Sequence, residues 1–415
     1  MPGRPVVGRL ACFLALTIGA IAVAGCDNAG LANPLASPSG SPAASAGATD
    51  SSSPSPTASL STTPTATSNP GPIADPQFIP ALGAIQMVNA HTGWAAGGYA
   101  IYATSDGSHW IKQYASTEQF VGVDFISVSI GWVVGVRSLL GTTDGGRTWL
   151  PLGEPSVPIR SVHFISASRG WAVAGGADPQ MQHGWLLPAS GGRLVTTADG
   201  GRSWTALGAP ADTAMVCFSD VAHGWLSTPR GTIYASGDGG LTWTKAGDVF
   251  SGEQPNTGPT VIECAAPSAL WAYTTIGNGA GGHLPYVVAV TQDGQSWQRI
   301  MTEPQTMSTL LPGVPAGPDS HPGSFSVVDA MDAVFIGDGP ATNVAQCVIA
   351  SSGGASLRRT GSIADSSETF GAAFLSITSG WVLTRNAAGD YVIDATGDGG
   401  YHWSQQLAVT PSSAG

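Results

Sequence analysis

The sequence predicts an all-β fold, a seven-bladed β-propeller of four-stranded antiparallel blades preceded by a disordered tether. Three observations lead to this prediction. A turn of the type TTDGGRTW (142–149) recurs along the chain; each copy is preceded by an alternating apolar strand, a turn and Gly-Trp or a similar pair; and no stretch shows helical periodicity. A period of about 48 residues with four short strands per repeat is typical of propeller blades.

Each repeat is expected to form four strands, here termed A to D. Strand A alternates apolar and polar residues, as in Val121, Val123 and Phe125; B begins at the Gly-Trp pair; C runs into the Asp-containing turn; and D starts at the second tryptophan. A seventh, degenerate copy has Phe335 at the tryptophan position and Gly353 in place of the aspartate. Twelve of the 13 tryptophans fall at the two repeat positions, which predicts aromatic wedges between neighbouring blades.

The aspartate of the recurring turn is expected to cap a hairpin rather than to perform catalysis. Its carboxylate follows a strand and precedes glycines that tolerate positive φ, so it can accept backbone N–H groups across the turn. A cap repeated around a ring cannot converge on one substrate. The structural aspartates are Asp106, Asp144, Asp199, Asp238, Asp293 and Asp398.

These turns resemble Asp-box, or BNR, repeats, which occur in sialidases, in some polysaccharide hydrolases and in sortilin-type receptors. The spacing from Gly-Trp to the Asp turn is most similar to the photosystem II stability and assembly factor family. The resemblance covers about four fifths of the chain. It implies the propeller fold and a scaffold or assembly style of action, while one fold hosts many activities.

The N-terminus predicts an exported lipoprotein. Arg4 and Arg9 precede an apolar run that ends in VAGC (23–26), which resembles a bacterial lipobox; an ordinary secretory signal is the alternative. We therefore expect a signal peptide over 1–25, lipidation of Cys26, a disordered Ser/Pro/Thr/Ala-rich tether over 26–74 and the propeller over 75–411. The expected location is the outer face of the cytoplasmic membrane or the cell surface.

The charge balance excludes polyanionic partners. With 15 Lys and Arg against 27 Asp and Glu, the net charge is −12, and only Lys112 and Lys245 are lysines. Nucleic acid and anionic lipid surfaces require clustered cations. We expect no cofactor, no metal, a monomer, and membrane attachment only through the lipid.

The long insertions predict where a partner binds. They fall in B–C and D–A connections, all on the face opposite the Asp turns, and long loops on a rigid scaffold are where binding residues tend to lie. Trp185 lies outside the repeat scheme beside His183, and either binds a ligand or only packs the insertion. The candidate binding residues on this face are Trp185, His183, Asp178, Arg193, His283, Tyr286 and His321.

One A-strand position is expected to lie near the central channel. It reads Gln86, Asp124, His163, Cys217, Glu263, Val327 and Ala373 along the chain. Asp124, His163 and Glu263 either line the channel or bond to neighbouring backbone as buried groups. Cys217 and Cys264 fall on A strands of consecutive repeats and form a possible disulfide, which export would permit.

The sequence favours a binding or scaffold protein for a protein or glycan partner over an enzyme. Sialidase chemistry needs several arginines, yet no basic residue occurs between Arg9 and Lys112. No metal spacing, nucleophile elbow or phosphate loop appears. The alternative is a cell-surface glycoside hydrolase, which needs two carboxylates about 5–10 Å apart across a cleft.

Overall fold

The computed structural model describes residues 79–153, 157–177, 180–182, 185–187, 190–210, 212–246, 257–276, 283–304 and 311–411. The predicted signal peptide, Cys26 and the tether lie outside these residues. The described residues form only strands, turns and connections, and none of them belongs to a helix long and apolar enough to cross a membrane.

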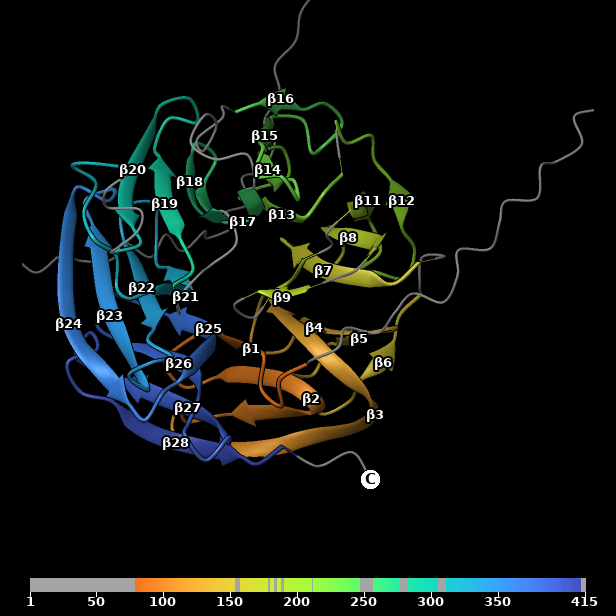
Figure 1. Cartoon of the computed structure of the whole chain (residues 1–415). Helices are drawn as coiled ribbons and strands as arrows, with labels where there is room; N and C mark the ends of the chain where they lie inside the picture. The colour runs from red at the N-terminus through yellow and green to blue at the C-terminus, as the bar shows by residue number, and fades with distance from the viewer. Residues whose placement is uncertain are drawn as a thin grey trace, which may run out of the picture. The chain divides into compact units, whose positions relative to one another are not determined.

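The strands form six large antiparallel sheets arranged around a ring, so the described fold is a six-bladed β-propeller (Figure 1). The first sheet has the order β1 to β6: Ala84–Met87, Gly93–Thr104, Trp110–Phe125, Gly131–Gly135, Leu139–Thr142 and Leu150–Pro151. The second has the order β12-β11-β8-β7: Thr205–Ala206, Ser190–Thr197, Gly170–Ala177 and Ile159–Phe164. The third contains β13 to β16: Met215–Phe218, Gly224–Ser227, Ile233–Ser236 and Thr244–Lys245.

The remaining sheets have four strands each. The fourth contains β17 to β20: Thr257–Ala266, Ala269–Ile276, Tyr286–Thr291 and Trp297–Thr302. The fifth contains β21 to β24: His321–Val327, Ala333–Asp338, Val344–Ser351 and Ser356–Ala364. The sixth contains β25 to β28: Glu368–Phe374, Gly380–Arg385, Tyr391–Thr396 and Ser404–Val409. A separate two-stranded ribbon joins β9 (Gln180–Gln182) to β10 (Trp185–Leu187).

The prediction of seven separate four-stranded blades is wrong, because β3 merges two expected strands. β3 runs without interruption from Trp110 to Phe125, pairing with β2 on one side and β4 on the other. It joins the D strand expected in the first repeat to the A strand expected in the second, which places both repeats in one six-stranded sheet. Residues 111–119 contain no Gly or Pro that would end the strand, so β3 continues through them. The next D–A connection, 150–158, contains both residue types.

Tryptophans at the start of the second strand of each repeat pack onto the next inner strand, as predicted. The rings of Trp94, Trp132 and Trp171 stack on Phe125, Phe164 and Phe218 with centroids 3.5–3.6 Å apart. The indole N–H of Trp171 also donates to the carbonyl of Gly239 in the next sheet at 3.0 Å. Each of these tryptophans therefore buries a large apolar surface, and Trp132 and Trp171 also satisfy their indole N–H in the next sheet, whereas the indole N–H of Trp94 has no partner among the described residues.

The ring closes by packing between the first and last sheets. One hydrophobic cluster contains Ile85 and Tyr102 from the first sheet with Phe370 and Trp381 from the last. The indole N–H of Trp381 donates to Gly107 O at 3.0 Å. In the described part of the chain, β28 pairs only with β27, so closure here rests on side-chain packing and these cross-sheet bonds.

Candidate functional site

The recurring turn aspartates hold their own hairpins. Asp144 accepts the Thr148 amide at 2.9 Å and both the Thr142 and Thr148 hydroxyls, while Gly145 and Gly146 adopt positive φ. The hydrogen bonds from Thr148 lower the pKa of Asp144 to about 2. Equivalent bonds surround the aspartates in the other five turns, Asp106, Asp199, Asp238, Asp293 and Asp398. These carboxylates stay ionised at neutral pH and face their own backbone.

These turns share one face of the ring with the connections between the first and second strands of each repeat. The Gly145 amide donates to Ser129 O at 2.9 Å, and Gly200 and Gly239 make the same bond to Ser168 and Ala222. The longer connections lie on the opposite face, here called the loop-rich face. This face contains the candidate binding residues.

The described candidates on the loop-rich face divide into two groups. His283, Tyr286 and His321 come together around the segment 311–320, here called the platform loop. Arg193 is exposed on β11, and no bond among the described residues links it to that group. Asp178 and His183 lie outside the described residues, and Trp185 is described only as the first residue of β10, opposite Gln182.

The platform loop is fixed to the strands beneath it. The Tyr286 hydroxyl donates to Asp319 O at 3.1 Å, and the Leu284 amide donates to Ser320 O at 3.0 Å. The Arg359 guanidinium of β24 donates to the carbonyls of Gly317 and Pro318. Tyr286 itself is fully buried, so it acts here as a support beneath the surface.

Two histidines border the platform loop. His283 Nδ1 lies 3.0 Å from Oε1 of Glu303, a carboxylate with no exposed side-chain area. His321 Nδ1 lies 3.2 Å from the Ser320 hydroxyl, and burial lowers its pKa below the usual value. His321 is therefore neutral at pH 7 and offers one donor and one acceptor. The arrangement suits hydrogen bonding to a partner.

Two neighbouring carboxylates, those of Glu303 and Asp338, lack the exposure that acid–base chemistry in a cleft needs, whereas Asp319 of the platform loop is partly exposed. Glu303 is covered, and burial raises the pKa of Asp338 well above its usual range despite hydrogen bonds from Thr369. The described residues contain no cluster of three or more His, Cys, Asp or Glu side chains placed to hold a metal ion.

Polar side chains at the inner A-strand position bond to the backbone of the next inner strand. They do not form a polar channel lining at every blade. Asp124 accepts the Phe164 amide at 2.6 Å, His163 Nε2 lies 2.7 Å from Phe218 O, and Glu263 accepts the Val327 amide at 2.9 Å. Gln86 makes the same contact with the Phe125 backbone.

The assignment of Val327 to this position is wrong by one residue. Ser326 pairs opposite Val334 in β22 and accepts the Phe374 amide at 3.0 Å, as Asp124 pairs opposite Trp132 and accepts from Phe164. It follows that Val334, rather than Phe335, occupies the tryptophan position of this repeat.

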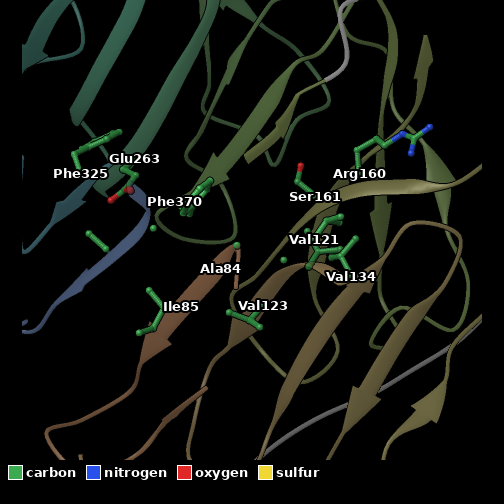
Figure 2. A pocket seen from close by; sticks show the side chains of 15 residues that line it. Ala84, Ile85, Val121, Val123, Val134, Arg160, Ser161, Glu263, Phe325 and Phe370 are labelled. Atoms are coloured by element: carbon green, nitrogen blue, oxygen red, sulfur yellow. The ribbon is translucent and has the colours of Figure 1, made fainter. Parts of the chain in front are cut away.

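A small cavity of about 80 Å³ lies among these inner strands (Figure 2). Figure 2 shows Val123, Glu263 and Phe325 reaching it from β3, β17 and β21, while the Arg160 guanidinium points away from the others. Ligand sites usually occupy about 300 Å³ or more. The central cavity is therefore too small to be the main binding site.

Cys217, Cys264 and Cys347 have free thiols in this structure, and the disulfide between Cys217 and Cys264 stays a prediction. Both residues line a cavity of about 170 Å³ between β13 and β17. Burial, together with the neighbouring Cys264 thiol, raises the pKa of Cys217 well above its usual value. A thiol that resists deprotonation is a poor nucleophile.

Sequence reasoning missed a larger cavity of about 290 Å³, here called the seam pocket, between the first and last sheets on the loop-rich face. Lys112, Arg385 and Tyr391 are among its lining residues. These positions are up to about 280 residues apart in the chain, so no local motif signals them. The rarity of lysine in the sequence is the one feature that could have pointed to Lys112.

Comparison with known proteins shows likeness in fold and in one segment. No family model matches the chain. The photosystem II stability/assembly factor HCF136 of Arabidopsis thaliana is 28% identical over 125 residues, and the match spans 28% of each chain. An ancestral GH74 enzyme has a TM-score of 0.50 at 14% identity over 80% of this chain and 47% of its own. YCF48 bound to D1 peptide has a TM-score of 0.47 at 19% identity, covering 71% and 84%. The likeness in fold thus rests on the GH74 enzyme, and the likeness in sequence on one segment of HCF136.

Proposed function

We propose that this chain is an exported lipoprotein, anchored through Cys26, whose monomeric propeller binds a protein or glycan partner through its loop-rich face. The proposal places it at the outer face of the cytoplasmic membrane or the cell surface. The lipobox-like VAGC (23–26) and the following Ser/Pro-rich segment support the anchor. We also propose that the six turn aspartates belong to Asp-box repeats with a structural role.

The fixed platform loop is the observation that carries the binding role. Arg359 and Tyr286 hold its carbonyls, so the polar side chains of His283, Ser320 and His321 are presented in a set arrangement. A preorganised surface binds without the entropic cost of ordering a loose loop. Two of the carboxylates nearby, Glu303 and Asp338, are buried and therefore unsuited to hydrolysis.

Replacing Arg359 with alanine should release the platform loop and weaken partner capture at least fivefold. The test is pull-down of envelope components by the full chain, together with hydrogen exchange of the Gly317 amide, which donates to Thr302 O at 2.7 Å in the folded loop. Arg358→Ala is the matched control, because Arg358 reaches the Tyr401 hydroxyl instead. Undiminished capture despite faster Gly317 exchange would exclude the platform loop as the binding surface.

Replacing Cys26 with serine should move the full chain from the membrane fraction to the soluble fraction. Serine lacks the thiol to which a lipid attaches. Persistence of Cys26→Ser in the membrane fraction would contradict the lipid anchor. The same preparations should show no turnover of a fluorogenic glycoside panel, and turnover would favour the hydrolase alternative.

A further inference from the structure

The seam pocket is a local concentration of positive charge in an acidic protein. It lies where β2 and β3 meet β27 and the end of β28 (Figure 1). Its lining contains the cations Lys112 and Arg385 and no aspartate or glutamate. The chain as a whole carries a net charge of −12. An anionic group would therefore be attracted to this pocket even though the chain as a whole is acidic.

The two cations are held over tyrosine rings. Lys112 Nζ lies 5.8 Å from the ring centroid of Tyr102, and the Arg385 guanidinium lies 5.8 Å from that of Tyr391. Within the described chain, no carboxylate forms an ion pair with Lys112. Arg385 lies 3.5 Å from Glu368, which is outside the lining of the pocket. The pocket thus retains about one uncompensated positive charge, which matches a single anion.

The walls of the seam pocket combine aromatic and polar groups, which suits a compact sugar ring. Tyr102 and Tyr391 are buried, and Tyr99 leaves 42% of its surface exposed beside Gly97 and Gly98. Glycines carry no side chain to narrow the entrance. Gln119 and Thr410 add hydrogen-bonding groups that can reach hydroxyls. At about 290 Å³, the pocket fits one sugar-sized unit, close to the lower limit for ligand sites.

We propose that the seam pocket binds one carboxylate-bearing sugar unit of the uronic acid type. The carboxylate lies between Lys112 and Arg385, where the planar guanidinium matches its geometry. The ring lies against Tyr99. A single acidic sugar fits better than an acidic polypeptide segment, because the net charge of −12 on the chain repels further anionic residues.

This inference deepens the proposed function by naming a ligand for the loop-rich face. Calorimetric titration of the purified full chain at low ionic strength tests it with three probes: sodium glucuronate, glucose and the peptide acetyl-Gly-Glu-Gly-amide. Glucuronate should bind at least tenfold more tightly than either of the others. No glucuronate binding, or equal binding of glucose or the peptide, would overturn the assignment.

Substitutions in the seam pocket test whether glucuronate binds there. Lys112→Gln and Arg385→Gln should each weaken glucuronate binding about tenfold, or about 1.4 kcal/mol. Arg147→Gln, an exposed cation in a turn on the opposite face, should leave binding unchanged. Lys112 is exposed on β3, so its replacement keeps the test valid if Arg385→Gln unfolds. Unchanged binding in Lys112→Gln would overturn the location. Partner capture that persists without glucuronate binding would reject this inference while leaving the proposed function standing.

Discussion

Replacing Trp171 with alanine is expected to lower the free energy of unfolding by about 4 kcal/mol, the largest loss we expect from a single substitution. Trp171 has no exposed surface and stacks on Phe218 with ring centroids 3.6 Å apart. Its indole N–H bonds to Gly239 O, and the Arg169 guanidinium lies 4.7 Å from its ring centroid. Alanine removes all three contacts and leaves a cavity between the second and third sheets.

Chemical denaturation followed by tryptophan fluorescence measures this effect. Trp171→Phe keeps an aromatic ring against Phe218 but loses the bond to Gly239, so we expect a smaller loss of about 1–2 kcal/mol. This graded variant remains informative if Trp171→Ala fails to fold. Leu241→Ala is the control, because Leu241 is 69% exposed and should change stability by less than about 0.5 kcal/mol. If Trp171→Ala matched the control, the wedge would not hold the interface.

The wedge was predictable because tryptophan recurs at fixed positions in nearly every repeat. The number of blades was not, since it depends on whether the chain breaks between repeats. Residues 111–119 offer no turn signal, and β3 continues through them. The number of repeats equals the number of blades only if the strand breaks between every two repeats, and this one connection does not break.

The degenerate repeat shows how a one-residue error changes the chemistry. Because this repeat lacks both the tryptophan and the aspartate, its sequence favours Phe335 at the tryptophan position, and this register places Val327 at the inner bonding position. The pairing of Ser326 with Val334 shifts the frame by one residue. Because side chains alternate between the faces of a strand, this shift replaces an apolar side chain with the hydroxyl that accepts the Phe374 amide.

The candidate site was predictable only as a face. Loop lengths indicated the correct side of the ring for His283 and His321, because insertions are visible in the sequence. The partners of these residues were not visible: Glu303 and Arg359 come from other segments, and the seam pocket unites residues from both ends of the propeller.

Replacing Glu263 with glutamine should remove part of the pH dependence of stability. Burial raises the pKa of Glu263 from 4.5 to about 7, only partly offset by the bond from the Val327 amide. A carboxyl group with a raised pKa holds its proton more tightly in the folded state than in the unfolded chain. Its contribution therefore favours folding below pH 4.5 and is lost as the pH rises to about 7.

At pH 8 we expect Glu263→Gln to exceed the wild type in stability by about 2–3 kcal/mol, whereas at pH 4.5 the two should differ little. Glutamine cannot ionise, yet its amide oxygen can still accept the Val327 amide. Asp124→Asn is a graded comparison, since burial raises the pKa of Asp124 to about 6, against the opposing effects of His163 and the Phe164 amide. The gain in stability of Asp124→Asn over the wild type should therefore appear at lower pH and be smaller.

Denaturation curves of both variants at several pH values separate the two groups. Parallel pH dependences for Glu263→Gln and the wild type would show that Glu263 ionises freely. Because Glu263 bridges β17 and β21, a confirmed effect would also show that ionisation of this carboxyl group loosens this blade interface as the pH rises.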